Sequence, residues 1–220
     1  VSSPSGAGKT TLCRELRKRH PDLRFSVSYT TRAQRIGEVP GLDYHFVTDA
    51  VFQSMIDRGA FAEWATIHGN RYGTSVQTVQ DALNQCQHVL FDIDYQGAES
   101  LQSQFRNEAR LIYILPPSLA VLAARLRARG TESEDRVQAR LKKAKEELSH
   151  HGSYAYLVLN DNMDHALLEL SLLYQMESQS DFTATWTQEA QAIVARCRPL
   201  HRIGLVHALL DEPLTISSQP

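Results

Sequence analysis

The sequence has few cysteines, no long apolar run and almost no net charge. Cys13, Cys86 and Cys197 are an odd number at wide spacing, which excludes a disulfide framework and a four-ligand zinc site. No run approaches the roughly 18 apolar residues that a membrane-spanning helix needs. A formal net charge of −2 provides no broad attraction to nucleic acid or anionic lipid. These absences predict a cytoplasmic protein that binds neither nucleic acid nor a membrane.

The composition is that of a globular protein. Hydrophobic residues make up 42% of the 220 residues and charged residues 22%, so the chain can bury a core. The length exceeds that of one average domain but is short for two, which predicts one compact domain with an additional element.

Strand and helix patterns alternate along the chain. Short apolar or β-rich runs occur at residues 43–47, 61–67, 89–93, 111–115 and 156–159. Helical patterns occur at residues 9–18, 48–58, 118–126, 137–148 and 167–174. Strands separated by helices of about ten residues pair in parallel through crossover connections. The pattern therefore predicts an α/β fold with a parallel sheet, in which ligands bind beyond the carboxyl ends of the strands.

The most informative segment is residues 3–10, Ser-Pro-Ser-Gly-Ala-Gly-Lys-Thr, which we call the phosphate loop. Gly6 and Gly8 allow backbone N–H groups to turn toward a phosphate, and the helix that follows adds its positive end. Lys9 supplies a charge for the β- and γ-phosphates, and the Thr10 hydroxyl suits Mg²⁺. Ser3 stands where glycine is usual, so this position needs a backbone conformation that serine can adopt.

The strand that should precede the phosphate loop is represented only by Val1 and Ser2. Such a strand would lie centrally in the sheet. We therefore expect the natural chain to begin several residues earlier.

A second group of polar residues lies within residues 25–47. Arg32 and Arg35 are three residues apart, with Ser28 before them and Tyr44 after them. Forked guanidinium groups and hydroxyls can converge on one phosphate dianion. The alternative is that both arginines are solvated in a polar loop.

Motifs along residues 1 to about 175 resemble, in order, those of the guanylate kinase family in its bacterial form. After the phosphate loop come Ser28, Tyr29-Thr30-Thr31-Arg32, Arg35, Gly37-Glu38-Val39 and Asp43-Tyr44-His45-Phe46-Val47. Then follow Glu63-Trp64, Gly69-Asn70-Arg71-Tyr72-Gly73-Thr74, Asp92-Ile93-Asp94-Tyr95-Gln96-Gly97, Pro116-Pro117-Ser118, Arg129-Gly130-Thr131-Glu132 and Asn160-Asp161.

The resemblance implies transfer of the γ-phosphoryl group of ATP to GMP or dGMP, with Mg²⁺, giving ADP and the nucleoside diphosphate. It also implies a P-loop NTPase-type parallel sheet flanked by helices, with a small β-rich part that binds GMP and a helical lid. The expected division is a kinase-like domain at 1–177 followed by a helical extension with a flexible tail at 178–220. Within the first, the core is expected at 1–27 and 78–177, the GMP-binding part at 28–77 and the lid at about 125–150.

The resemblance also assigns site residues by position. The residues matched to GMP-binding positions are Ser28, Arg32, Arg35, Tyr44, Glu63, Tyr72, Thr74, Asp92 and Asp94. The residues matched to ATP-binding positions are Ser3, Pro4, Ser5, Gly6, Ala7, Gly8, Lys9, Thr10, Thr11, Arg125, Asn160 and Asp161. The catalytic positions fall on Lys9, Arg129 and Arg140, and the metal position on Thr10.

The guanine-reading positions, Glu63 and Thr74, also make chemical sense. One carboxylate can accept hydrogen bonds from both N1–H and the 2-amino group of guanine, and a hydroxyl can donate to O6. Adenine lacks those two donors, so it would leave Glu63 desolvated and unpaired.

Alternative interpretations remain at this point. Some domains of this fold bind phosphorylated peptides without catalysis, and a related P-loop kinase could act on another phosphorylated acceptor. The presence of Lys9 and Thr10 disfavours the first alternative, and Glu63 with Thr74 disfavours the second. The extension is predicted to dock on the kinase core, or to form a subunit contact anchored by Trp186. Both a monomer and a homodimer therefore stay open.

Overall fold

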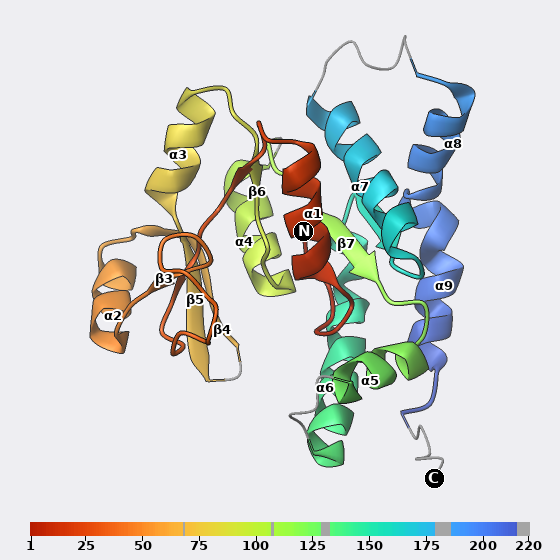
Figure 1. Cartoon of the computed structure of the whole chain (residues 1–220), viewed down its shortest axis with the longest axis horizontal. Coiled ribbons are helices and arrows are strands. Elements are labelled where there is room, and N and C mark those ends of the chain that lie inside the picture. The colour runs from red at the N-terminus through yellow and green to blue at the C-terminus, as the bar shows by residue number, and fades with distance from the viewer. Residues whose placement is uncertain (68, 107, 129–132, 179–185, 215–220) are drawn as a thin grey trace. The chain divides into compact units, whose positions relative to one another are not determined.

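The fold is known from a computed structural model, shown in Figure 1. It describes residues 1–67, 69–106, 108–128, 133–178 and 186–214. No helix in these ranges is long and apolar enough to cross a membrane.

The chain forms two compact units. The first combines Val1–Arg19 with Arg110–Pro220, and the second is His20–Ala109. We describe each unit by itself. This division differs from the expected core at 1–27 and 78–177, because α3 (Val76–Asn84) and α4 (Tyr95–Phe105) pack on the sheet of the second unit.

The first unit is built on a short parallel sheet. Strands β7 (Ile112–Leu115) and β8 (Tyr156–Leu159) pair in parallel, and Ser2 forms a parallel bridge to Tyr113 on the other side of β7. The backbone N–H of Ser2 donates to Ile112, and its carbonyl accepts from Ile114. Ser2 therefore pairs with the sheet directly before the phosphate loop, on the side of β7 opposite β8. Val1 and Ser2 are both buried.

Helices surround this sheet. They are α1 (Lys9–Arg19), α5 (Leu119–Arg127), α6 (Glu134–Ser149), α7 (Met163–Ser178), α8 (Gln188–Arg196) and α9 (Pro199–Asp211), with a short 3₁₀ helix, η1 (His150–Ser153). Helix α1 packs on α7 and α5 on α6, and Leu12, Leu122 and Leu141 on these helices are fully buried. Serine at position 118 caps α5 by accepting from the N–H of Val121 at 3.1 Å.

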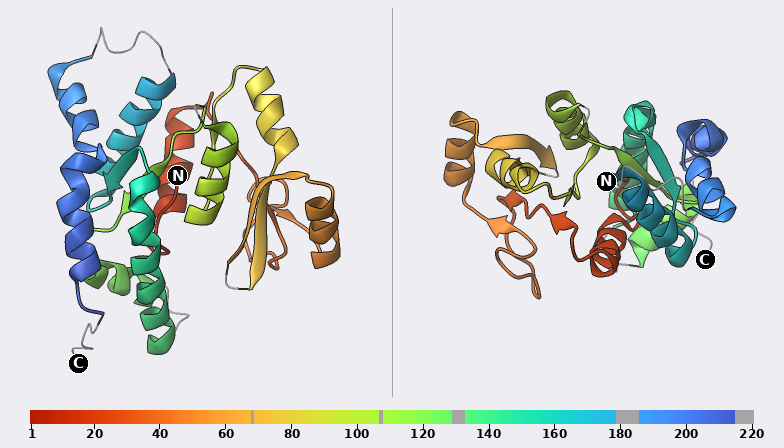
Figure 2. Two further views of the ribbon diagram at one scale, coloured as in Figure 1. Left: turned by 180° about the vertical axis from the view of Figure 1, so that it is seen from behind. Right: turned by 90° about the horizontal axis from the view of Figure 1, so that it is seen from above.

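The C-terminal helices belong to the same unit. Helix α8 packs on α7, and α9 packs on α6 and β8. Figure 2 shows the two blue C-terminal helices beside the teal helices of this unit. The backbone N–H of Leu157 in β8 donates to the carbonyl of Cys197 at 2.7 Å. The connection between α8 and α9 thereby satisfies a backbone donor on the edge of the sheet.

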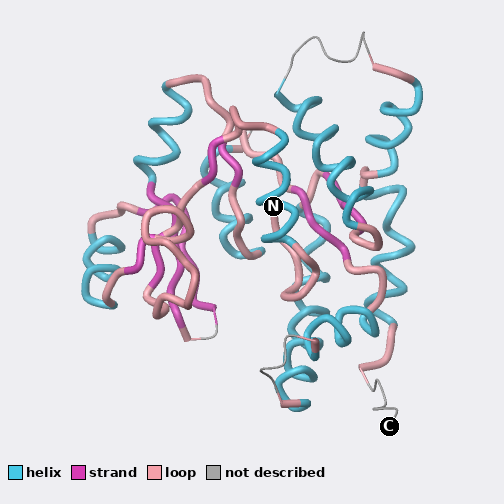
Figure 3. The backbone as a smooth tube through the Cα atoms, in the orientation of Figure 1, coloured by secondary structure: helices cyan, strands magenta, loops and turns pink. Residues whose placement is uncertain are grey.

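The second unit contains a mixed sheet and a parallel strand pair, drawn in magenta in Figure 3. Its strands are β1 (Arg24–Phe25), β2 (Tyr29–Thr30), β3 (His45–Phe46), β4 (Phe61–Ile67), β5 (Asn70–Ser75) and β6 (Val89–Leu90). Strands β1 and β6 pair in parallel. The mixed sheet has the order β3-β2-β5-β4, in which β5 is antiparallel to both of its neighbours.

Helices cover this second unit as well. Helix α2 (Asp49–Asp57) begins after Thr48, whose side chain caps it by accepting from the N–H of Val51. It buries Phe52 and Met55 against Phe61 of β4. The predicted α/β class, with parallel pairing and flanking helices, is confirmed in both units.

Candidate functional site: a donor side and an acceptor side

The phosphate loop in the first unit has the backbone that its glycines were predicted to allow. Gly6 and Gly8 both have φ of +96°, where residues with a side chain are strained. A Cβ atom at Gly8 would lie 2.4 Å from Nδ2 of Asn160, and one at Gly6 would lie 3.0 Å from Cδ2 of Leu126. Glycine is therefore required at both positions by conformation and by space.

The start of the loop is not strained by its serine. Cys86 is the non-glycine residue with positive φ among those that the structure describes, so Ser3 adopts an ordinary conformation. The Ser3 hydroxyl donates to the carbonyl of Pro4 at 3.0 Å. Lys9 is the first residue of α1, and Thr10 and Thr11 are exposed in its first turn. The loop thus leads directly into a helix N-terminus, as an anion site requires.

Asn160 supports the loop from the end of β8. Its side chain is buried, and Nδ2 donates to the carbonyl of Ala7 at 2.6 Å. The amide is therefore engaged with the loop backbone, a role that the resemblance did not indicate. Asp161 is exposed beside it and accepts from the N–H of Asn162 at 2.6 Å.

Three arginines with expected roles in ATP binding or catalysis, Arg125, Arg129 and Arg140, fall in the expected lid range. Two of them contact residues in or next to the phosphate loop. Arg125 donates through Nη2 to the carbonyl of Asn160 at 3.0 Å, while its Nη1 is buried without a hydrogen-bond partner among the described residues. Arg140 donates through Nη1 to the hydroxyl of Ser5 at 3.2 Å. A buried guanidinium nitrogen with no acceptor is costly, and an anionic ligand would satisfy it. Arg129 lies outside the described residues.

On the acceptor side, in the second unit, Glu63 and Thr74 are directly opposite each other on β4 and β5. Both are buried, with exposed fractions of 6% and 0%. The hydroxyl of Thr74 has no hydrogen-bond partner in the described part of the chain. A buried hydroxyl next to a buried carboxylate forms an arrangement that a polar ligand can complete.

Two features of the backbone direct Glu63. The register of β4 shifts between Phe61 and Glu63, as in a β-bulge, and such irregularities re-aim side chains. The Glu63 carboxylate then lies beside Gly97, where an added Cβ would be 2.6 Å from Oε2. Gly97 is in the first turn of α4, which Asp94 caps by accepting from its N–H at 3.0 Å. The positive end of α4 therefore favours negative charge at Glu63.

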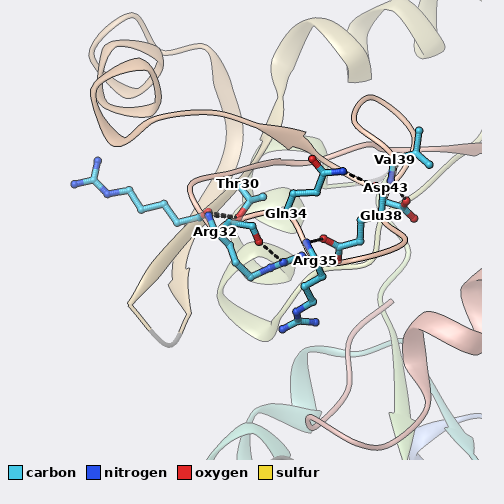
Figure 4. A network of polar contacts seen from close by, with 9 residues as sticks. Thr30, Arg32, Gln34, Arg35, Glu38, Val39 and Asp43 are labelled. Carbon is cyan, nitrogen blue, oxygen red and sulfur yellow. Dashed lines mark hydrogen bonds and ion pairs between the residues drawn. The ribbon is translucent and has the colours of Figure 1, made fainter.

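Arg32 is held by a carboxylate in the same segment, as Figure 4 shows. Its Nη2 lies 2.7 Å from Oε1 of Glu38, and the other oxygen of Glu38 accepts from the N–H of Arg35 at 2.8 Å. Burial of Arg32 acts to lower its pKa, but the hydrogen bond and charge of Glu38 outweigh it and raise the pKa. Burial likewise acts to raise the pKa of Glu38, and its bonds to Arg32 and Arg35 lower it.

Aromatic rings complete the surroundings of Arg32. Its guanidinium carbon lies 5.4 Å from the centre of the Tyr44 ring and 5.8 Å from that of Phe46. The Tyr44 and Tyr72 rings meet edge to face at 5.9 Å. Arg32 therefore lies beside the Tyr44 ring, which in turn meets Tyr72.

The remaining predicted acceptor residues have different exposures. Arg35 is exposed, and its described contact is through the backbone. Ser28 is buried immediately before β2, and its carbonyl accepts from the N–H of His45. Asp92 lies between β6 and α4, where a ligand site was expected after a strand. The residue that sequence reasoning missed is Glu38, although it lies within the recognised segment.

The comparisons with known proteins bear on the whole arrangement. The family model described as "Guanylate kinase" matches residues 1–177, which is more than half of the chain. The chain belongs to the guanylate kinase family. The match includes the phosphate loop of the first unit and, in the second unit, Glu63 with Thr74 and the Arg32 network.

Individual guanylate kinases are similar over most of their length. That of Syntrophotalea carbinolica is 46% identical over 177 residues, 80% of this chain and 84% of that protein. That of Zymomonas mobilis is 44% identical over 213 residues, 97% of this chain and 92% of that protein. The crystal structure of guanylate kinase from Anaplasma phagocytophilum matches with a TM-score of 0.68 and 32% identity, over 82% of this chain and 85% of that one. The fold predicted from the motifs is confirmed.

Proposed function

We propose that the phosphate loop holds ATP and that Glu63 and Thr74 select the acceptor in the reaction that this family catalyses. The reaction transfers the γ-phosphoryl group of ATP to GMP and yields ADP and GDP. The chain spans 84% to 92% of the relatives described above, and that supports the same activity here. The alternative of a non-catalytic phosphopeptide-binding module is not favoured.

The observation that carries the acceptor assignment is the buried pair Glu63 and Thr74. Guanine presents two adjacent donors, N1–H and the 2-amino group, which the buried Glu63 carboxylate can accept together. The Thr74 hydroxyl lacks a described partner and can donate to O6. Guanine complements both groups at once, whereas adenine presents no donor to the carboxylate at either of these places.

The acceptor phosphate is assigned to the network around Arg32. In this network Glu38 forms an ion pair with the guanidinium of Arg32, which lies beside the Tyr44 ring. A phosphate dianion offers more oxygens than Glu38 does, so it can compete for the Arg32 guanidinium and bind Arg35, Ser28 and the two tyrosine hydroxyls as well. Asp92 and Asp94 are assigned to the remainder of the acceptor site.

The donor side provides positive charge for the transferring group. The N–H groups of the phosphate loop and Lys9 bind the β- and γ-phosphates, and Arg125 and Arg140 add guanidinium groups. Arg129 is assigned to the same task on the family pattern. Asn160 holds the loop backbone through its hydrogen bond to Ala7. We therefore assign contact with the ATP base to the exposed Asp161. Phosphoryl transfer needs alignment and charge neutralisation more than covalent help.

Mg²⁺ is the cofactor that we propose for the donor nucleotide. Among the described residues, no group of three or more His, Cys, Asp or Glu side chains could hold a metal ion. A hard cation prefers oxygen ligands, so the phosphates of ATP and the exposed Thr10 hydroxyl would hold it. Bound there, Mg²⁺ would offset charge on the phosphates during transfer. A cytoplasmic location and a monomeric or homodimeric state stay predictions.

A substrate panel tests the proposal. ADP release from ATP is coupled to a spectrophotometric signal, with GMP, dGMP, AMP, CMP or UMP as the acceptor. We expect kcat/KM for GMP to be highest, dGMP to be slower, and AMP to be lower than GMP by about 10³-fold or more, because binding sites reject analogues that leave a buried polar group unpaired. Equal turnover of AMP would refute the acceptor assignment, and no ADP release with any acceptor would favour the binding module.

A further inference from the structure

The C-terminal end of α9, with its cap residue Glu212, contacts α5 and α6, two helices that lie against the phosphate loop. At its C-terminal end, Glu212 accepts two backbone hydrogen bonds from the start of α5. Its Oε2 accepts from Leu119 at 2.8 Å and its Oε1 from Ala120 at 3.0 Å. Lys145 of α6 donates through Nζ to the carbonyl of Leu210 at 2.6 Å. The end of α9 is thus tied to α5 and to α6.

Helices α5 and α6 in turn support the loop itself. Leu122 and Leu126 of α5 pack against Gly6 so closely that a Cβ there would lie 3.1 and 3.0 Å from their methyl groups. Arg125 of α5 and Arg140 of α6 reach Asn160 and Ser5 through the hydrogen bonds described above. A displacement of either helix would therefore shift the loop atoms that it contacts, because close-packed interiors transmit small shifts.

The other end of α9 is tied to the third support of the loop. Arg202 donates through Nη1 to the carbonyl of Leu157 in β8 at 2.9 Å, and its Nη2 pairs with Glu169 of α7. Strand β8 leads within a few residues to Asn160, which bonds Ala7 in the loop. Helix α9 thus contacts every one of these three supports: α5, α6 and β8.

We propose that Glu212 is a positioning residue for the donor nucleotide and that α9 aligns the supports of the phosphate loop. The side chains of Glu212 and Ser118 together satisfy the N–H groups of Leu119, Ala120 and Val121, the first turn of α5. Removing the carboxylate leaves two of these donors unsatisfied and takes a negative charge from the positive end of the helix. The first turn then loosens, and Leu122 within it loses its fixed position against Gly6.

This inference rests on the proposed role of the loop as the donor site, and it predicts an effect confined to that side. The test compares the full-length chain with Glu212→Gln, which keeps the size of the side chain but loses one acceptor oxygen and the charge. Asp211→Asn is the matched control, because Asp211 is the exposed neighbour at the end of the same helix. KM for ATP and KM for GMP are measured separately, at a temperature well below thermal unfolding.

We expect Glu212→Gln to raise KM for ATP by about three- to tenfold, the range that loss of a cap would give if it acted on binding, with KM for GMP unchanged. Asp211→Asn should match the parent chain in both constants. A merely structural role would lower the unfolding temperature and leave both constants alone. That result, or an equal rise in both constants, would overturn the proposal.

A binding measurement separates this inference from the proposed function. ADP is titrated calorimetrically into the chain without any acceptor, with Glu212→Gln and Lys145→Met as the variants. Each variant breaks one tie to α9, and both should weaken ADP binding. Parental ADP affinity in both variants would overturn the inference. If the unaltered chain binds ADP but does not phosphorylate GMP, the proposed function fails and the inference is judged on the titration alone.

Discussion

Replacing Lys9 with alanine is expected to lower kcat for phosphoryl transfer by about 10³-fold or more, the loss seen when a charge is removed from a transferring phosphoryl group. Lys9 opens α1 directly after Gly8, whose φ of +96° turns the loop into the helix. The residues assigned to GMP lie in the other compact unit, so the Kd for GMP should remain unchanged. Coupled ADP release measures kcat, and calorimetry measures GMP binding.

The matched control is Lys18→Ala near the other end of the same helix. Lys18 is largely exposed and pairs with Glu15 at 2.9 Å, a surface ion pair of small energetic value. This control should retain the parental kcat. Normal turnover by Lys9→Ala would contradict the role that we assign to the phosphate loop.

Replacing Glu63 with alanine is expected to remove most of the preference for GMP over AMP. The variant should lose about 10²- to 10⁴-fold in kcat/KM for GMP, since a site that hydrogen-bonds its substrate discriminates by that order. The AMP value should stay the same or rise, because adenine makes no hydrogen bond to the carboxylate and the cost of desolvating it is removed. The ratio of the two kcat/KM values measures the effect.

The control for this variant is Glu108→Ala, which removes an exposed glutamate in the same compact unit. It should keep both the rate and the preference. A Glu63→Ala protein that still prefers GMP as strongly as the parent would show that another residue reads the base.

The elements with local signals were predictable from the sequence. The β-rich run at 61–67 coincides with β4, and the helical patterns at 48–58 and 118–126 match α2 and α5, which Thr48 and Ser118 cap. These signals act within a few residues, so they can be read without knowledge of the fold. Helices α3 and α4 and strands β2 and β5 were not assigned individually, because their runs are short or mixed in polarity.

Contacts between distant segments could not be predicted from such patterns. The Asn160 amide meets Ala7 across 153 residues, and Glu212 meets Leu119 across 93 residues. Both polar side chains look like ordinary turn or helix-end residues in the sequence. Only the packing of β8, α5 and α9 shows what they bond.

The phosphate loop could be predicted from the residues alone, whereas the pair of Glu63 and Thr74 could not. The spacing of Gly6, Gly8, Lys9 and Thr10 identifies a phosphate loop by itself, because all four groups act within one turn of chain. The pairing of Glu63 with Thr74 was implied only by the family resemblance. It depends on the register of β4 with β5 and on the irregularity beside Phe61, which alternation of polarity does not indicate.

The most direct test of the account is a crystal structure of the chain with GMP and a non-hydrolysable ATP analogue bound together. The account predicts the Glu63 carboxylate within hydrogen-bond distance of guanine N1 and the 2-amino group, and the phosphate loop wrapped around the β-phosphate of the analogue. A structure in which Glu63 points away from the base, or in which the analogue binds elsewhere than the loop, would contradict it.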